Sequence, residues 1–283
     1  MMKILTRSLK KPFAAGPIPV FLLILLLILC QAVPAGSPGK NEKTGTFCQM
    51  DPGAGFENEG SNYCAPTSIA NGLIYLATAR GLKDLVDGTD HKAQIALIKK
   101  LADEMDTDPD IGTNPSKIID GLESYLDSKG YSFARLEVAG WRNLNDDHEK
   151  YLVSKKPDMK WIRSAVEDPD TVVILNNGWY RDAGGGGYTR KGGHFVIAVG
   201  AGPKDSELQV HNPALESDEQ KTETSVTMAL IDDNTVAEAK ANGVEELELD
   251  GYYKMEGPGL PYTSEKAAFA ALDFVIIFKL KKE

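Results

Sequence analysis

The sequence predicts an α+β protein in which a group of helices precedes an antiparallel sheet. Amphipathic helical patterns dominate residues 64–129, whereas apolar runs of strand length dominate the region after residue 170. The chain contains no internal repeat. This segregation of helices from strands favours an α+β arrangement over an alternating α/β one.

The first 35 residues are predicted to be an export signal rather than part of the fold. A basic leader precedes the apolar run PVFLLILLLILCQAV, and small residues ending at Ala35 suit cleavage. Two alternatives stay open: lipidation at Cys30, although Leu29 is large for the preceding position, and an uncleaved anchor, although the run is shorter than the ~20 residues that span a bilayer comfortably. We expect a secreted or periplasmic protein, with membrane contact only through an uncleaved or lipidated N-terminus.

The charge balance disfavours nucleic acid as a partner. The whole chain has a formal net charge of −10, from 31 basic and 41 acidic side chains, and four of the basic ones precede Ala35. Removing residues 1–35 therefore leaves a balance of −14. The roughly 248 residues that remain are enough for one large domain.

The predicted elements begin after a polar linker, GSPGKNEKTG, at residues 36–45, so we expect one domain over residues 46–283. The first helix is predicted over residues 64–80, where apolar residues recur at helical spacing. Two further helices, at 90–105 and 115–129, complete a helical segment at about residues 80–130.

The second half is predicted to be mainly strands. The expected strands are SFARLEV, TVVILNNGWY, GGHFVIAVGAG, SELQVHNPA, GYYKM and LDFVIIFKL, with helices at 158–166 and 236–241. The glycine-rich stretch RDAGGGGYTRKGG between two of the strands is predicted to be a mobile hairpin loop.

Cysteine and histidine spacing gives no sign of a metal site. Downstream of Ala35 only Cys48 and Cys64 remain, and a disulfide between them, which would block both thiols, stays open as an alternative. There is no CxxC motif, and the four histidines are scattered. We therefore predict neither a metal nor an organic cofactor.

Three residues could form one catalytic site. Cys64 falls at a predicted helix N-terminus, where backbone N–H groups favour a thiolate and can hold an oxyanion. His194 opens an apolar strand, and Asn212 on the next strand could accept one of its ring N–H groups. Strand alternation points His211 to the opposite face, which makes it the weaker base. Taken singly, each of the three residues favours a structural role; their order and setting together favour one catalytic site.

The supporting residues are less certain from sequence. The second oxyanion donor is expected to be Asn58, or else Asn62, which also suits a helix cap; Gln49 is more distant in sequence. Trp179 and Gly193 are candidates for substrate contact. The glycine run between them is interpreted either as a flap over the cleft or as a hairpin tip.

Three segments, NYCAPTSIANGLIYL, GGHFVIAVGAG and LQVHNPA, together resemble the papain-like cysteine peptidases that cut double-glycine leader peptides from bacteriocins. The resemblance covers residues 58–214. It implies a papain-like fold with the nucleophile helix packed on an antiparallel sheet, Cys64 as nucleophile, His194 as general base and Asn212 as the residue that orients it. Two positions depart from the family pattern, which has glutamine where this chain has Asn58 and usually aspartate in place of Asn212.

These observations predict an exported thiol hydrolase, a cysteine peptidase that acts on a peptide or protein through an acyl-enzyme. Two alternatives use the same residues. One is a non-catalytic pseudo-peptidase that binds peptides or a partner protein at the cell surface. The other is an amidase or acyltransferase.

Overall fold

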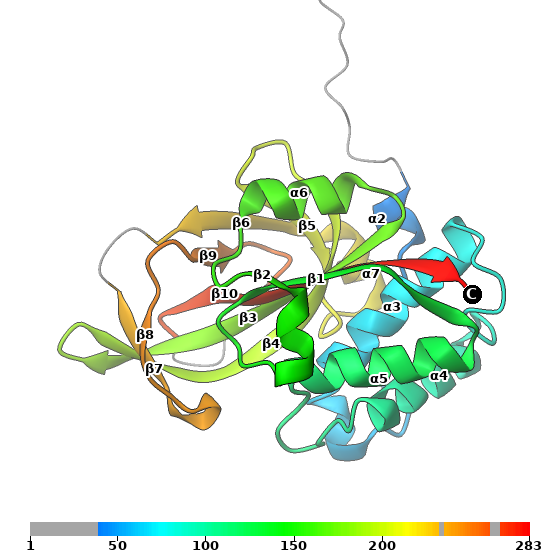
Figure 1. Ribbon diagram of the computed structural model, residues 1–283, viewed down its shortest axis with the longest axis horizontal. Coiled ribbons are helices and arrows are strands. Elements are labelled where there is room, and N and C mark those ends of the chain that lie inside the picture. The colour runs from blue at the N-terminus through cyan, green and yellow to red at the C-terminus, as the bar shows by residue number, and fades with distance from the viewer. Residues whose placement is uncertain (1–38, 232–234, 261–266) are drawn as a thin grey trace, which may run out of the picture. The chain divides into compact units, whose positions relative to one another are not determined.

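A closed antiparallel β-barrel of six strands forms the centre of the fold (Figure 1). Each strand pairs with the next around the ring, and the last pairs with the first. In order around the ring the strands are β10 (Phe269–Lys282), β3 (Thr171–Gly184), β4 (Gly187–Ala201), β5 (Glu207–His211), β6 (Ser225–Leu230) and β9 (Tyr253–Glu256). This computed structural model describes residues 39–231, 235–260 and 267–283.

Four strands extend the sheet beyond the barrel. Strand β1 (Tyr131–Gly140) pairs antiparallel with β10, and the short β2 (Leu152–Ser154) runs parallel to β1. Strand β7 (Val236–Ala239) runs parallel to the start of β4 and pairs with β8 (Val244–Glu248).

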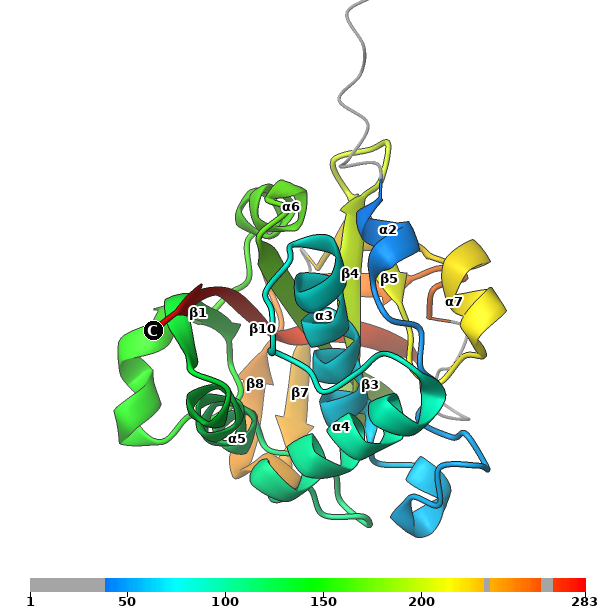
Figure 2. The same cartoon turned by 90° about the vertical axis from the view of Figure 1, so that its right-hand side faces the viewer.

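The helices pack outside the ring. Helices α3 (Cys64–Ala79), α4 (His91–Glu104) and α5 (Pro115–Ser128) lie together on one side (Figure 2). Helix α6 (Met159–Glu167) packs against β3 and β4. The remaining helical pieces are short: α2 (Lys40–Lys43), α7 (Ser217–Thr222) and 3₁₀ turns at Glu57–Gly60, Asp146–Tyr151 and Lys240–Asn242.

Strand alternation divides the core between the two sides of the sheet. On β3, Val172 and Ile174 face the cluster built by α3, α4 and α5, whereas Val173 and Leu175 face the cluster shared by β5, β6 and β9. Because both faces are buried, the middle of β3 is apolar throughout, which is why it was recognisable as a strand.

The three long helices confirm the sequence prediction, and local signals explain their starts. Asp90 caps α4 by accepting the amide of Ala93, and Asn114 caps α5 immediately before Pro115.

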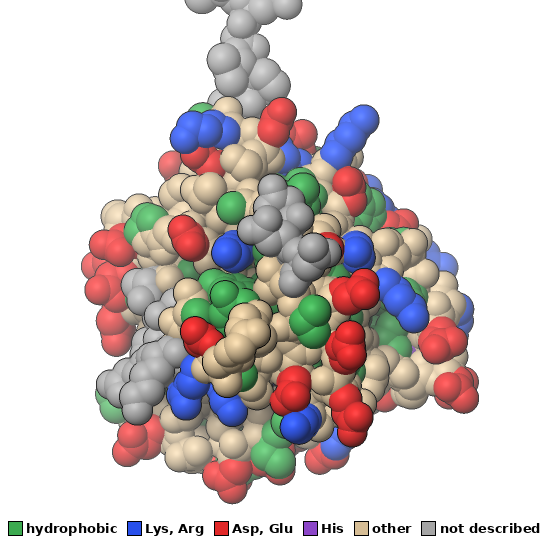
Figure 3. Space-filling model, turned by 90° about the vertical axis from the view of Figure 1, so that its left-hand side faces the viewer, with side chains coloured by type: hydrophobic (Ala, Val, Ile, Leu, Met, Phe, Trp, Pro, Cys, Tyr) green, Lys and Arg blue, Asp and Glu red, His purple; other side chains and the backbone are tan. Residues whose placement is uncertain are grey.

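The surface carries charges of both signs. Figure 3 shows acidic side chains spread over the face on the left-hand side of Figure 1, with lysine and arginine among them. No helix among the described residues is long and apolar enough to cross a membrane.

The predicted fold class was wrong. A papain-like α+β arrangement, with the nucleophile helix packed on an antiparallel sheet, is contradicted because the chain is mostly β and its sheet closes into a barrel. Closure depends on β6 and β9, whose segments SVTMAL and YKME lack a long apolar run. These strands join β5 to β10, a pairing that neither sequence segment indicates alone.

Three local predictions also differ from the structure. The glycine-rich stretch 181–193 is largely strand: β3 and β4 continue to a tight turn in which Gly185 and Gly186 have positive φ of 66° and 86°. The helix expected over 236–241 is β7 followed by a 3₁₀ turn. Within the expected linker, Lys40 of α2 is buried and donates from Nζ to the carbonyl of Val166 at 3.0 Å. Residues 1–38, including the predicted signal segment and Cys30, lie outside the described residues.

Candidate active site

Cys64 is the first residue of α3, as predicted, and its side chain is buried beside β4. The backbone N–H groups of Phe195, Ala65 and Cys64 itself lie near the thiol and act to lower its pKa. Ser68, one turn further along α3, donates from Oγ to the carbonyl of Phe195 at 3.1 Å. Helix α3 is therefore held against the residue that directly follows His194.

His194 and Asn212 are joined by a short hydrogen bond. Nε2 of His194 lies 2.7 Å from Oδ1 of Asn212, and both side chains are buried. His194 lies in β4, and Asn212 comes directly after β5, the antiparallel neighbour of β4. The predicted hairpin between these strands is confirmed, and it brings together two of the three expected residues.

The surroundings of Asn212 fix the tautomer of His194. Oδ1 of Asn212 also accepts the amide of Ala214 at 2.9 Å, and its Nδ2 donates to the carbonyl of Gly259 at 3.2 Å. These two backbone groups set the orientation of the amide, so Oδ1 must accept a hydrogen bond from the Nε2–H of His194. Nδ1 is therefore left as the basic nitrogen.

Trp179 covers the imidazole. Its ring stacks on that of His194 with centroids 6.2 Å apart and planes 12° apart. The opposing residue across β3 and β4 is Gly192, where an added Cβ would lie 3.1 Å from the indole. Trp179, a candidate for substrate contact, thus lies where it shields and orients the base, whereas Gly193 lines the cavity described below.

Burial leaves the resting pair uncharged. Desolvation raises the pKa of Cys64 to about 11, although the three backbone N–H groups oppose this shift. Desolvation also lowers the pKa of His194 to about 4, against the hydrogen bond that His194 donates to Asn212, which raises it. The helix start was expected to favour a thiolate; that expectation was wrong because burial outweighs the helix amides. Among the described residues, no hydrogen bond joins the thiol to His194.

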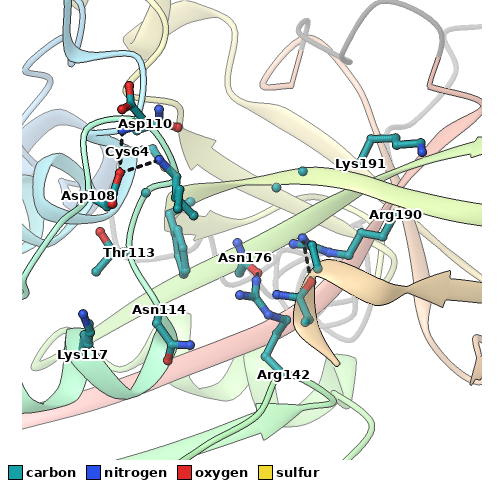
Figure 4. A pocket seen from close by; sticks show the side chains of 18 of the residues that line it. Cys64, Asp108, Asp110, Thr113, Asn114, Lys117, Arg142, Asn176, Arg190 and Lys191 are labelled. Atoms are coloured by element: carbon teal, nitrogen blue, oxygen red, sulfur yellow. Dashed lines mark hydrogen bonds between the residues drawn. The ribbon is translucent and has the colours of Figure 1, made fainter. Parts of the chain in front are cut away.

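A cavity of about 630 Å³ opens beside Cys64. One wall is the middle of β4, with Gly193 and Phe195, and the opposite wall is the loop between α4 and α5 (Figure 4). Its volume lies within the roughly 300–1,000 Å³ of small-molecule sites. Two arginines also line it: Arg190, nearer the start of β4, and Arg142, which follows β1.

The two asparagines proposed for the oxyanion hole occupy different places. Asn58 is exposed, has a positive φ of 46° and donates from Nδ2 to the carbonyl of Pro109 at 3.1 Å. Asn62 donates to the same carbonyl at 2.7 Å but lines the cavity with Cys64. The preference for Asn58 is therefore not supported by its position, and Asn62 is the better placed of the two.

Gln49 supports the turn before α3, a role that the sequence does not indicate. It is buried, and its Nε2 donates to the carbonyls of Gly60 at 3.0 Å and Ser61 at 3.1 Å. Gly60 packs directly on the backbone of Gln49, where an added Cβ would collide with the Gln49 carbonyl. Gln49 thus braces the turn that leads into α3. Because Gln49 lies more than ten residues before this turn, its hydrogen bonds to Gly60 and Ser61 could not be predicted from the sequence.

The other candidate groups lie apart from this pair. Cys48 and Cys64 are both buried free thiols, so they form no disulfide. Both ring nitrogens of His211 are engaged elsewhere, with Nε2 at 2.5 Å from Oδ1 of Asn41 and Nδ1 at 3.2 Å from the carbonyl of Gly45. These contacts agree with its weaker claim as a base.

One group of side chains has donors spaced as a cation would need. Asp120, Glu123 and His148 place one ligand atom each within 4.8 Å of one another. His148 already pairs with Asp120 at 3.0 Å, and Glu123 accepts from Tyr151 at 3.1 Å. These contacts account for the group without an ion, and the sequence analysis did not single it out.

Comparison with family models, with curated proteins and with solved structures found no match for this chain.

Proposed function

We propose that the chain is a thiol hydrolase that cleaves peptide bonds, with Cys64 as nucleophile, His194 as general base and Asn212 as the residue that orients His194. The observation that carries the proposal is the hydrogen bond of 2.7 Å between His194 and Asn212. It leaves Nδ1 as the basic nitrogen, on the residue that precedes the one contacting the thiol. The three motifs that resemble double-glycine peptidases support the same assignment of roles.

In this mechanism the thiol proton moves during the attack rather than before it, because both groups are neutral at pH 7. For the attack, the Cys64 thiol has to come within reach of Nδ1 of His194, which is not among the residues that line the cavity; Nδ1 takes the thiol proton as sulfur bonds to the substrate carbonyl. Hydrogen bonds to catalytic groups commonly tighten in this way when substrate binds. The N-terminal amides of α3 hold the oxyanion.

The intermediate then collapses with return of that proton. His194 gives it to the leaving nitrogen, the C–N bond breaks, and the acyl group stays on sulfur as a thioester. Water, deprotonated by the same Nδ1, attacks the thioester and releases the acid and the thiol. Asn212 stabilises the imidazolium that exists in both steps.

The raised pKa of Cys64 supports a second candidate, a binding module of the same site that does not turn substrate over. Incubation of the protein with a peptide library, followed by mass spectrometry of the products, separates the two. The proposed hydrolase predicts cleavage that Cys64→Ala and His194→Ala abolish and that Cys48→Ala, the other buried free thiol, preserves. Cleavage that survives in Cys64→Ala would refute the proposed nucleophile, and binding without cleavage by the wild type would favour the binding module.

We also propose that the protein is exported through its N-terminal segment. A basic leader, an apolar run and small residues before Gly36 support this. Expression of the full chain followed by N-terminal sequencing tests it. A mature N-terminus at Gly36 is expected, and an intact Met1 or a lipid on Cys30 would instead identify one of the two anchored forms.

A further inference from the structure

Two arginines converge at the end of the cavity away from the α4–α5 loop. Arg142 follows β1, and Arg190 lies in β4, four residues before His194. Both guanidinium groups lie over the ring of Trp141, with carbon-to-centroid distances of 5.7 Å and 5.6 Å. Figure 4 shows the two side chains meeting there, with Asn176 beside Arg142.

Among the described residues, one carboxylate forms an ion pair with either of the two cations. Arg190 donates from Nε to Asp273 at 2.6 Å, and the side chain of Arg190 is only 7% exposed while that of Asp273 is fully buried. The other oxygen of Asp273 accepts from Tyr180 at 2.7 Å. Among the described residues Arg142 has no carboxylate within ion-pair distance and donates to Oδ1 of Asn176 at 3.1 Å.

The site therefore carries an excess positive charge at low exposure. Nη2 of Arg190 is buried and has no hydrogen-bond partner among the described residues. Burial, and then the charge of Arg190, lower the pKa of Arg142 to about 10, which leaves Arg142 charged at pH 7. Buried cations without a counter-charge are costly, and an anionic ligand removes that cost.

The sheet is shaped around this group. Gly178 and Gly193 face each other across β3 and β4. An added Cβ at Gly178 would lie 2.1 Å from Oδ2 of Asp273, and one at Gly193 would lie 2.3 Å from Nη2 of Arg190. Any other residue at either position would displace the ion pair, so the two glycines leave the room that it occupies.

One side chain links the arginines to the catalytic base. Asn176 accepts from Arg142 and donates from Nδ2 to the carbonyl of His194 at 3.1 Å. A ligand anion on Arg142 would thus lie in the same cavity as Cys64.

Three aspartates, Asp106, Asp108 and Asp110, line the opposite wall, and among the described residues none forms an ion pair with Arg142 or Arg190. Asp106 forms an ion pair with Lys117, and Asp108 accepts the amides of Asp110 and Ile111 at 2.8 Å and 3.0 Å. These contacts keep both carboxylates within the α4–α5 loop region.

We propose that Arg142 and Arg190 bind a carboxylate of the substrate, which makes the substrate an acidic peptide. This rests on the proposed function. The guanidinium group binds carboxylates through paired N–H donors, and such charge-assisted bonds are strong when buried. The carboxylate belongs either to a glutamate or aspartate side chain or to the C-terminus of the peptide.

Peptide binding to the Cys64→Ala protein tests the proposal without requiring cleavage. The probes are four fluorescent hexapeptides of one sequence, with glutamate or glutamine at one inner position and a free or amidated C-terminus. We expect at least tenfold tighter binding of one carboxylate-bearing form over the neutral form, and which form it is identifies the source. Arg142→Gln should remove the preference, and Arg142→Lys should retain part of it. Arg80→Gln should leave it unchanged, because Arg80 pairs with Asp170 outside the cavity.

The two proposals fail in different ways. Equal binding of all four peptides, including no measurable binding of any, would overturn the carboxylate site, as would a preference that survives Arg142→Gln in a folded protein. Those results leave the library cleavage assay to decide the hydrolase independently. A carboxylate preference in a wild type that cleaves nothing would instead keep the site and refute the hydrolase.

Discussion

Replacing Asn212 by alanine removes the contact on which the proposed base depends. The side chain is 1% exposed and makes three hydrogen bonds, with His194, Ala214 and Gly259. At about 1 kcal/mol net for each bond, with an added cost for polar groups left buried, Asn212→Ala should lower the free energy of unfolding by about 2–4 kcal/mol. Urea unfolding at pH 7 measures this loss.

The effect on rate follows from the charge that His194 acquires. In the transition state the imidazole becomes a cation, and a hydrogen bond to a charged group contributes about 1.5–3 kcal/mol. Loss of that bond should reduce kcat/KM by roughly 10- to 150-fold. The measurement is kcat/KM on a peptide identified by the library assay, without denaturant and at a pH where the variant is shown to be folded.

Asn212→Asp is the matched second variant because it keeps the acceptor and adds a negative charge. In the wild type, protonation of His194 should remove activity as the pH falls through about 4. A carboxylate beside His194 favours the imidazolium, so it raises the pKa of His194 and moves this acid limb to higher pH. If Asn212→Ala, fully folded, keeps kcat/KM within twofold of the wild type, or if Asn212→Asp leaves the acid limb in place, the reasoning is refuted.

Three further predictions concern the surroundings of the base. Trp179→Ala should lower kcat about tenfold with little change in KM, since the indole orients His194 and does not line the cavity; steady-state kinetics measure the split. Burial lowers the pKa of both His194 and His211 to about 4, below the unfolded value of ~6.5. The free energy of unfolding should therefore stay constant above pH 6.5. It should fall by up to ~3 kcal/mol per histidine as the pH drops toward 4, because the unfolded chain then binds more protons. Urea titrations across that range should show the loss, and His211→Gln should reduce it. Gly193→Ala should destabilise the fold by about 1–3 kcal/mol, because its Cβ would meet the guanidinium of Arg190.

The helices were predictable because their signals are local. Asp90 and Asn114 each accept a backbone amide two or three residues ahead, and the apolar spacing that follows needs no distant partner. The barrel was not predictable from the same kind of signal. Its closure depends on pairings such as Met228 with Met255 and Ala271 with Lys254. These pairings join the short strands β6 and β9 to each other and to β10, and the sequences of the two short strands do not specify a pairing register.

The candidate site likewise contains residues with local sequence signals and residues whose roles depend on long-range pairing. The order of Cys64, His194 and Asn212 was predictable because each belongs to a recognisable local pattern: a helix start, the start of an apolar run and an Asn-Pro pair. The prediction that His194 opens its strand was wrong, because β4 begins at Gly187. The roles of Trp179 and of the two arginines were hidden, since they depend on which residues face each other across β3 and β4. The raised pKa of Cys64 was missed because the sequence indicates a helix N-terminus but not how deeply it is buried.

The structure holds the proposed base, His194, in a fixed position. His194 is held by Asn212 at its ring, by Trp179 on its face and by Asn176 at its carbonyl. Cys64 lines the cavity, whereas neither His194 nor Trp179 is among the residues that line it. Because Asn176 also contacts Arg142, a carboxylate bound by the arginines would lie one side chain away from His194. In the proposed mechanism the contact between the thiol and the imidazole therefore has to form when substrate binds, and the carboxylate site is placed to couple the two events.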